Sequence, residues 1–390
     1  MRSLLTSFFL IFLLSLNACI SKNENDLTLR LGCEKFEKYL PELKGKNVGL
    51  LVNHTSMVGS SHLVDTLLSQ NISITKIFAP EHGFRGTADA GEHVASDVDV
   101  MTGIPVISLY GKNKKPSKDD LENVDIVIFD IQDVGVRFYT YISSMHYMME
   151  ACAENGVKML VVDRPNPNGD YFDGPVLKKE FRSFVGMHPI PVVHGLTVGE
   201  LALMINGEGW LKDSVQCDLS VIKMDNYRHD MPYSLPVKPS PNLPNDLSIR
   251  LYPSLCFFEA TDVSVGRGTY MPFQVLGYPD PIYGDFTFTP VGIEGMSKNP
   301  PQKDKLCYGL DLRTESLSHQ FTIKYLISFT RKAENTAGLV SNPRWFNLLA
   351  GNDTLLEKIK EDWSESEIKL SWKTELDSYC KLRDRYLLYP

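Results

Sequence analysis

The chain has 390 residues, of which 43% are hydrophobic, 10% aromatic and 23% charged. This is a globular composition, and it excludes a disordered or low-complexity chain. The net charge of −8 argues against binding to nucleic acid through the overall electrostatic field, so no nucleic-acid partner is predicted. The length is sufficient for two domains.

The first predicted feature is an export signal. Residues 4–16 (LLTSFFLIFLLSL) form an apolar run of 13 residues, which is too short to span a bilayer comfortably and is typical of a secretory signal. The next residues, Asn17-Ala18-Cys19, resemble a bacterial lipobox, in which the cysteine is lipidated. We therefore expect a lipoprotein signal peptide at 1–19 with lipid on Cys19, and a tether at 20–34. The protein would then be exported and lipid-anchored in the bacterial cell envelope, periplasmic or associated with the outer membrane. The alternatives are an ordinary cleaved signal and a buried apolar segment.

From residue 47 onward, short apolar runs alternate with helical patterns. The runs rich in Val, Ile and Leu are 47–52, 72–79, 105–110, 125–131, 157–162 and 218–224. The helical patterns between them are 61–69, 117–122, 139–155 and 197–210. Apolar runs separated by helices are typical of a parallel sheet covered on both faces. The sequence therefore predicts an α/β fold, with a Rossmann-like, doubly wound and mainly parallel sheet over 35–235.

A proline-rich stretch between Pro232 and Pro244 breaks this pattern and marks a linker or a long loop. Beyond it, 250–290 is rich in aromatics, Gly and Pro, and helical patterns return at 317–332, 343–348 and 353–387. We expect a second, smaller α+β domain over 245–390. The seven cysteines are scattered without any CxxC pair, which favours buried free thiols over a metal site.

Polar side chains follow the predicted strands at the edge where a parallel sheet binds its ligands. They are Glu81, His82, Asp130, Gln132, Asp133, Arg137, Asp163 and Arg164. Each also has a structural interpretation, as a loop cap or a partner of another loop charge. The same holds for His194 and for Glu200, which fits a capping box with Thr197. Arg267 is harder to explain in that way, because a glycine on each side lets the backbone approach a ligand.

Several cofactor and catalytic motifs do not occur. The sequence has no GxGxxG after the first strand, no GxxxxGK[ST], no GxSxG and no HExxH. The available side chains are carboxylates, arginines, aromatics and amides. This set suits a carbohydrate, because acids transfer protons, amides bind hydroxyls and aromatic faces cover sugar rings.

These residues carry a resemblance to a known family. The runs that carry it are PEHGFRG (80–86), FDIQDVGVRFYTY (129–141), DRPNP (163–167), HGLTVGELA (194–202), SPNLP (240–244), GRGT (266–269) and RYLLY (385–389). They resemble the exo-β-N-acetylmuramidase family over about residue 35 to the end of the chain. At 259–261 this chain has Glu-Ala-Thr where the family pattern has Glu-Gly-Thr.

The resemblance implies a glycosidase of peptidoglycan recycling. Such enzymes release N-acetylmuramic acid from the non-reducing end of peptidoglycan fragments. Their fold is a Rossmann-like domain joined to a smaller C-terminal domain, with the active site in the cleft between the two. The catalytic glutamate of the family corresponds to Glu81 of this chain.

Glycoside hydrolysis usually needs a second carboxyl group. With Glu81 as general acid, we expect Glu259 to be the second group, with Asp130 and Asp133 as the next candidates. A bidentate arginine would bind the lactyl carboxylate of muramic acid, and the candidates are Arg267, Arg137 and Arg164. His82, Gln132, Tyr139 and Asn242 are expected to bind ring hydroxyls or the acetamido group, with Asp163 and His194 also in the site. The scheme needs no metal ion and no cofactor.

Three other functions stay open on the sequence alone. One is a metal-dependent hydrolase that uses His54, His82, Asp130 and Asp133. Another is a non-catalytic lipoprotein that binds muropeptides. The third is a nucleotide-dependent Rossmann enzyme, which the missing glycine motif disfavours.

Overall fold

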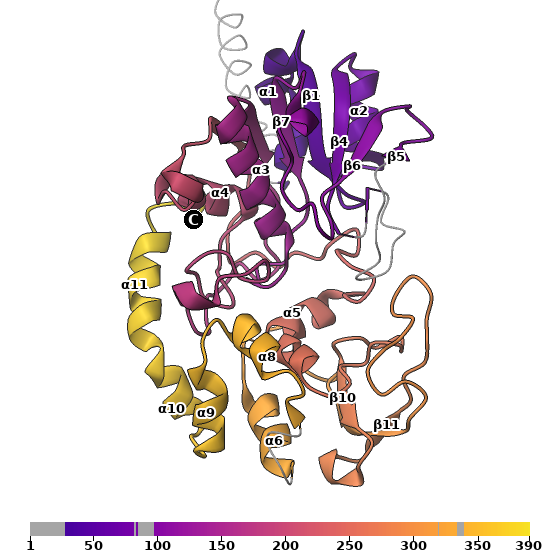
Figure 1. Ribbon diagram of the computed structural model, residues 1–390, viewed down its shortest axis with the longest axis vertical. Helices are drawn as coiled ribbons and strands as arrows, with labels where there is room; N and C mark the ends of the chain where they lie inside the picture. Colours follow the sequence, from indigo (N-terminus) through magenta and orange to yellow (C-terminus); the bar gives the residue numbers. More distant parts are fainter. Residues whose placement is uncertain (1–27, 82, 85–96, 319, 334–338) are drawn as a thin grey trace, which may run out of the picture.

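The N-terminal half of the chain is built on one large sheet. The computed structural model describes residues 28–81, 83–84, 97–318, 320–333 and 339–390, and Figure 1 shows two lobes stacked along the long axis. The sheet order is β5-β6-β4-β1-β7-β8-β9, and all of its strands are parallel except β5. In chain order the parallel strands lie 3-2-1-4-5-6, the order of the Rossmann fold. The bounds are β1 Asn47–Val52, β4 Ser73–Ala79, β5 Asp97–Val98, β6 Pro105–Ser108, β7 Ile126–Asp130, β8 Lys158–Val162 and β9 Leu219–Ile222.

Helices cover both faces of this sheet. Side chains from one face, such as Leu51 and Phe129, pack in one core with α3 and α4. Their neighbours Leu50 and Ile128 point to the other face and pack with α1 and α2. This double burial explains why the strand sequences are almost continuously apolar. The helix bounds are α1 Phe36–Leu43, α2 Leu63–Ser69, α3 Tyr141–Asn155 and α4 Val198–Gly207.

The remaining elements form a smaller lobe of mixed structure. Its antiparallel sheet has the order β10-β12-β11, and helices pack beside it (Figure 1). We refer to the part built on the large sheet as the N-terminal lobe and to the part from α5 onward as the C-terminal lobe. The bounds are α5 Asp246–Leu255, β10 Val275–Tyr278, β11 Phe286–Phe288, β12 Cys307–Asp311, α6 Lys324–Lys332, α8 Pro343–Ala350, α9 Thr354–Lys360, α10 Glu365–Ser371 and α11 Lys373–Arg383. The observed architecture confirms the predicted fold class.

Short elements complete the described chain. The strands β2 (Met57–Val58) and β3 (Ser61–His62) form a small hairpin. The 3-10 helices are η2 Gly32–Glu34, η3 Asp119–Leu121, η4 Lys179–Phe181, η5 Lys212–Ser214, η6 Cys256–Ala260 and η7 Pro281–Tyr283. None of the helices in the described part of the chain has both the length and the hydrophobicity needed to span a bilayer.

The last helix returns the chain to the N-terminal lobe. In Figure 1, α11 rises along one side of the molecule and ends near α4. The hydroxyl of Tyr379 donates to the carbonyl of His194 at 2.6 Å. The hydroxyl of Tyr389 donates to the carboxylate of Asp163 at 2.7 Å. Residues 373–390 therefore tie the two lobes together.

The start of the described chain is also packed on the N-terminal lobe. Arg30 and Asp225 exchange backbone hydrogen bonds of 3.1 and 2.9 Å, and Cys33 is fully buried. A Cβ on Gly32 would lie 2.5 Å from the backbone nitrogen of Asp163. Residues 30–34 of the expected tether thus lie against the folded lobe. The part of that tether before residue 28, with Cys19, lies outside the described residues.

Several elements differ from the sequence prediction. The pattern at 353–387 is divided into α9, α10 and α11, and 117–122 contains only η3. The helices α1 and α5 were not predicted, and each contains a proline, Pro41 or Pro253, a residue that disfavours a helix interior. The capping box of Thr197 and Glu200 is present at the start of α4. The six cysteines among the described residues are free thiols, and all except Cys380 are buried.

Candidate active site in the cleft between the lobes

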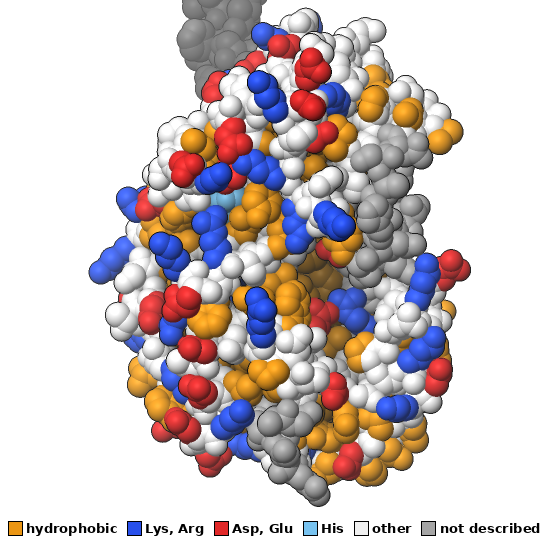
Figure 2. Space-filling model, viewed as in Figure 1, with side chains coloured by type: hydrophobic (Ala, Val, Ile, Leu, Met, Phe, Trp, Pro, Cys, Tyr) orange, Lys and Arg blue, Asp and Glu red, His pale blue; other side chains and the backbone are white. Residues whose placement is uncertain are grey.

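A cavity of about 730 Å³ lies where the two lobes face each other. Figure 2 shows the hollow, with hydrophobic side chains on its floor and charged side chains beside them. The volume is in the range of small-molecule sites in proteins. Its lining comes from both lobes and consists of Glu81, Tyr110, Gly111, Lys114, Phe138, Tyr139, Thr140, Tyr141, Ser183, Phe184, Val185, Ser240, Asn242, Leu243, Tyr252, Glu259, Arg267, Phe273 and Trp345.

Glu81 enters this cavity from the carboxyl end of β4. The neighbouring strand β6 ends at the same edge and is followed by Tyr110. Burial, and then the charge and hydrogen bond of Glu81, raise the pKa of Tyr110 to about 12. The hydroxyl of Thr140, just before α3, lies 3.4 Å from Oε2 of Glu81. The carboxyl group is thus half-buried and is surrounded by hydroxyl groups.

Glu259 reaches the cavity from the C-terminal lobe. It lies in η6, directly after α5, and its Oε1 accepts hydrogen bonds from Nε and Nη2 of Arg267 at 2.8 and 2.5 Å. The two side chains remain 24% and 21% exposed, so both face the cavity. Burial alone would lower the pKa of Arg267, but the charge and hydrogen bonds of Glu259 raise it. The guanidinium group therefore stays charged beside the carboxylate.

The backbone around this pair explains its sequence. Gly266 and Gly268 have φ values of +80° and +77°. A Cβ on Gly266 would lie 2.5 Å from the carbonyl oxygen of Met271, so only glycine fits. Ala260, where the family pattern has glycine, lies in η6 and has no positive φ. An alanine is therefore tolerated at that position.

Two further predicted residues line the cavity. The hydroxyl of Tyr139 donates to the carbonyl of Pro239 at 2.7 Å. Nδ2 of Asn242 donates to the carbonyl of Met296 at 2.9 Å. Oδ1 of Asn242 is buried and accepts no hydrogen bond from the described residues. Because a buried polar atom without a partner is costly, this oxygen is suited to accept a hydrogen bond from a bound ligand.

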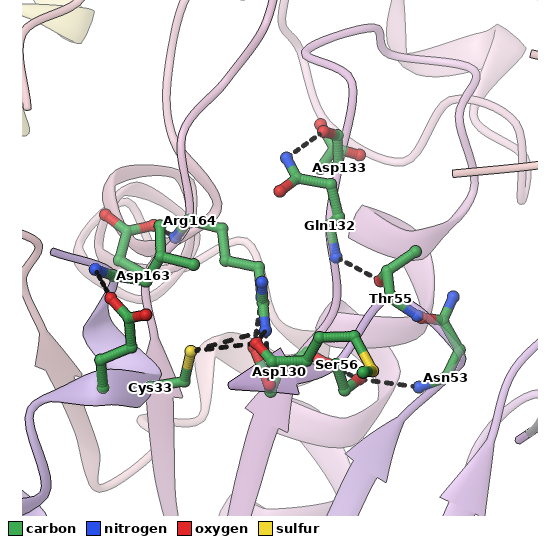
Figure 3. A network of polar contacts seen from close by, with 12 residues as sticks. Cys33, Asn53, Thr55, Ser56, Asp130, Gln132, Asp133, Asp163 and Arg164 are labelled. Atoms are coloured by element: carbon green, nitrogen blue, oxygen red, sulfur yellow. Dashed lines mark hydrogen bonds and ion pairs between the residues drawn. The ribbon is translucent and has the colours of Figure 1, made fainter. Parts of the chain in front are cut away.

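Asp130 and Arg164 form a buried ion pair at the ends of β7 and β8. Figure 3 shows the guanidinium group of Arg164 against the carboxylate of Asp130. Nε and Nη2 of Arg164 bind Oδ1 and Oδ2 at 2.5 and 2.9 Å, and Nη2 also donates to the carbonyl of Met57 at 3.0 Å. Burial lowers the pKa of Arg164, and the charge of Asp130 outweighs this and raises it. Neither residue is part of the cavity lining.

Four other predicted residues belong to the loops beneath the cavity. The amide of Gln132 donates to the carbonyl of Pro165 at 2.6 Å. Oδ2 of Asp133 accepts from the amide of Gly135 at 2.7 Å and lies 3.6 Å from Nε2 of His194. These bonds hold the strand-end loops together. Figure 3 shows the side chain of Gln132 beside Asp133, to whose carbonyl it donates at 2.8 Å, and the backbone amide of Gln132 bound to the hydroxyl of Thr55. Gln132, Asp133, Asp163 and His194 are all buried, and none of them lines the cavity.

Arg137 joins the two lobes. Its side chain is fully buried, and burial lowers its pKa to about 9. Nη1 donates to the carbonyls of Pro175 and Ile190 at 2.7 and 2.8 Å. Nη2 donates to the carbonyls of Leu349 and Ala350, at the end of α8, at 2.9 Å each. The structure therefore places this guanidinium group between lobes and away from the cavity lining.

The structure thus brings together five of the predicted site residues, Glu81, Tyr139, Asn242, Glu259 and Arg267, and keeps seven others out of the cavity. His82 lies outside the described residues. The prediction missed Tyr110, Lys114, Thr140, Phe184 and Trp345. Tyr110 directly ends a predicted strand and could have been found by the same argument as Glu81. Among the described residues, no group of three or more His, Cys, Asp or Glu side chains is arranged to hold a metal ion.

Comparison with known proteins gives matches over nearly the whole described chain. Residues 48–247 match the N-terminal domain model of the exo-β-N-acetylmuramidase NamZ, and residues 250–389 match the C-terminal domain model. The chain is 39% identical over 373 residues to the peptidoglycan β-N-acetylmuramidase NamZ of Bacillus subtilis (strain 168), covering 90% of this chain and 89% of that protein.

Two solved structures of DUF1343-family proteins from Bacteroides fragilis have the same architecture. One is 46% identical with a TM-score of 0.86, and the match covers 93% of this chain and 99% of that chain. The other is 28% identical with a TM-score of 0.81, covering 93% and 100%. Both domain models match, and the identity to the Bacillus subtilis protein extends over most of the chain. This chain therefore belongs to the exo-β-N-acetylmuramidase NamZ family.

Proposed function

We propose that this protein is an exo-acting β-N-acetylmuramidase, which releases N-acetylmuramic acid from the non-reducing end of peptidoglycan fragments during cell-wall turnover and recycling. The observation that carries the proposal is the cavity itself, which contains one carboxyl group from each lobe, Glu81 and Glu259, among aromatic and amide side chains. Glycosidases typically use two carboxyl groups in such a site, one on each side of the bond that is cleaved. The name of the Bacillus subtilis relative agrees with it.

Glu81 is the proposed general acid. It donates its proton to the glycosidic oxygen while the bond from that oxygen to C1 of muramic acid breaks, and water supplies the hydroxyl group that ends on C1. The hydroxyl of Thr140 and the phenol of Tyr110 are neutral donors. Both groups can orient the carboxyl group of Glu81 through hydrogen bonds.

Glu259 is the proposed second carboxylate. Its carboxyl group pairs with Arg267 and keeps a partly exposed surface, from which a carboxylate can activate water or stabilise positive charge on the sugar ring. Asp130, the next candidate, is enclosed by Arg164 and has no exposed surface. Asp133 is also buried. Glu259 is therefore the better placed of the three.

Other cavity residues are proposed to hold the sugar. The free Oδ1 of Asn242 is suited to the N–H of the acetamido group or to a ring hydroxyl. Tyr139, Phe184 and Trp345 supply aromatic surface in the cavity lining, and such surfaces pack against the apolar faces of sugar rings. No step of this scheme uses a cofactor.

The test uses protein lacking residues 1–19 and para-nitrophenyl β-N-acetylmuramic acid, with the β-N-acetylglucosamine analogue as a second substrate. We expect nitrophenol release from the muramic acid substrate only, with and without chelator. Glu81→Gln and Glu259→Gln should each lower kcat by roughly 100-fold or more. The exposed Glu180→Gln is the control and should act as wild type.

Other results would replace the proposal. Release that chelator abolishes would favour a metal-dependent hydrolase. A folded protein that binds muropeptides, releases nothing from either substrate and is unaffected by Glu81→Gln would favour a binding lipoprotein. If the muramic acid substrate is cleaved, NMR of the first-formed sugar shows whether the anomeric configuration is retained or inverted.

We also propose that the protein is exported and anchored by lipid on Cys19. The support is the apolar run of residues 4–16 and the lipobox-like Asn17-Ala18-Cys19. Expression of the full chain in a bacterial host, with mass spectrometry of the mature N-terminus, tests it. Cys19→Ala should abolish lipidation, and an unmodified Met1 at the N-terminus would contradict the proposal.

A further inference from the structure

Among the residues that the structure describes, one charged side chain of the cavity lining has no oppositely charged partner. Its described lining contains two carboxylates, Glu81 and Glu259, and two cations, Lys114 and Arg267. Arg267 is held by Glu259 through two of its nitrogens. Within the described chain, the ammonium of Lys114 contacts the ring of Phe184, with Nζ 4.1 Å from the centroid, and forms no ion pair. An anion that enters the cavity can reach this cation without displacing a carboxylate.

The position of Lys114 is determined by its neighbour. Nζ of Lys115 binds the carboxylates of Glu150 and Glu154 on α3 at 2.6 and 2.8 Å. This anchors the loop that follows β6 to the helix. The adjacent Lys114 lines the cavity, where it is half-buried.

Phe184 is anchored to the same helix. The hydroxyl of Ser143 donates to the carbonyl of Phe184 at 2.7 Å. The ring of Tyr147 stacks on that of Phe184, with centroids 6.1 Å apart and planes at 12°. The aromatic face holds one side of the Lys114 ammonium, and the other N–H donors remain available for an acceptor in the cavity.

The loop that carries Lys114 also carries Tyr110, the partner of Glu81. The free cation and the proposed acid therefore belong to the same wall of the cavity. Muramic acid differs from glucosamine by a lactyl ether with a carboxylate on the ring. That carboxylate needs a cation in a cavity that already contains two other carboxylates.

We propose that Lys114 binds the lactyl carboxylate of muramic acid and so distinguishes muramic acid from glucosamine. The assignment rests on the function proposed above and names the specificity residue of the same site. It differs from the sequence expectation, which gave this role to Arg267, Arg137 or Arg164. Arg267 is engaged by Glu259, while the other two are buried in the protein interior.

The experiment compares two substrates on three proteins. The substrates are para-nitrophenyl β-N-acetylmuramic acid and the same compound with its lactyl carboxylate converted to a primary amide. The proteins are wild type, Lys114→Met and Lys114→Arg. For Lys114→Met we expect a loss in kcat/KM of roughly 10-fold or more on the acid, mainly as a rise in KM, and less than about 3-fold on the amide. Lys114→Arg should retain most of the preference for the acid.

The matched control is Lys112→Met, because Lys112 lies on the same loop, is exposed and does not line the cavity. It should keep the wild-type constants. Equal losses of Lys114→Met on acid and amide, or an unchanged KM for the acid, would overturn the assignment. A wild-type protein that hydrolyses neither substrate would instead overturn the proposed function.

Discussion

At the scale of single residues, the charged side chains predicted for the site have two different roles. Glu81 and Glu259 face a cavity, while Asp130 and Arg164 are paired in the interior and are 0% and 3% exposed. A buried charge pair costs much to desolvate, and its integrity depends on both partners. This pair therefore contributes to the fold, and its removal should affect stability more than catalysis.

Asp130→Asn tests this division. The substitution leaves the buried guanidinium of Arg164 without its counter-charge, so the free energy of unfolding should fall by about 3–5 kcal/mol. Urea unfolding measures the loss, and kcat measured on the remaining folded protein should stay within a few-fold of wild type.

Asp230→Asn is the matched control, because Asp230 forms a solvent-exposed pair with Arg228. It should change stability by less than about 1 kcal/mol. If Asp130→Asn abolished turnover in a protein of wild-type stability, Asp130 would belong to the catalytic site after all.

The residues also show how far a site can be predicted from sequence. An apolar run followed by a polar residue identifies the end of a strand, and this predicted Glu81 and Asp130 equally well. The direction of the side chain depends on packing against the other strands and on the second lobe. Lys114 and Trp345 carry no local signal, because only tertiary structure brings their segments to the cavity.

At the scale of elements, α3 supports the wall of the cavity and encloses a buried polar cluster. Nε2 of His188 lies 3.0 Å from Nδ1 of His146 on this helix, and Arg182 lies 3.2 Å from the other nitrogen of His146. Burial, and then the charge of Arg182, lower the pKa of His146 to about 4. The pKa of His188 is also lowered, by burial and by its neighbours. Both imidazoles are therefore neutral in the native protein at pH 7.

This cluster predicts acid sensitivity. Between about pH 6.5, the ordinary pKa of histidine, and pH 4, the unfolded chain binds protons that the native cluster does not. The free energy of unfolding should therefore be greatest above pH 6.5 and should fall as the pH falls. Denaturant unfolding at pH 7 and pH 5 measures this, and His146→Gln should reduce the difference by roughly 1–2 kcal/mol. An unchanged difference in the variant would show that other groups cause the acid loss.

The sequence predicts the strands of the large sheet better than the helices. The parallel strands were predicted to within a few residues, because strands buried on both faces must be apolar throughout. The helices α1 and α5 contain prolines and were missed. The separation of α9, α10 and α11 was missed because their helical pattern continues across the breaks, where Asp362 has a φ of 64°.

At the scale of the whole molecule, the site depends on how the lobes are held. Arg137 donates from the N-terminal lobe to two carbonyls at the end of α8, and α8 carries Trp345 into the cavity. The amide of Lys178 adds a bond to the carbonyl of Gly351 at 2.9 Å. The ion pair of Lys369 with Asp173, at 2.6 Å, joins the lobes on the α10 side.

Arg137→Met should therefore lower the stability of the whole protein. In this variant, four buried carbonyl groups would lose their hydrogen-bond donor. The variant would no longer pay the cost of burying a charged side chain, which offsets part of that loss. We therefore expect the free energy of unfolding to fall by about 3 kcal/mol. Arg137→Lys should fall between wild type and Arg137→Met, because lysine cannot fork onto carbonyls on both sides. Thermal and urea unfolding measure the effect, and a stability equal to that of wild type in Arg137→Met would contradict the role.

The segment that follows α11 has a consequence for the order in which the protein is made. Asp163, at the end of β8, receives a hydrogen bond from Tyr389, which lies 226 residues later in the chain. Glu200, at the start of α4, accepts from the amide of Leu388 at 2.7 Å. Because synthesis runs from the N-terminus, the large sheet is available long before these donors exist. In a nascent chain interrupted before residue 388, the carboxylates of Asp163 and Glu200 therefore lack these hydrogen bonds. The N-terminal lobe reaches its final stability only when residues 388 and 389 have been added.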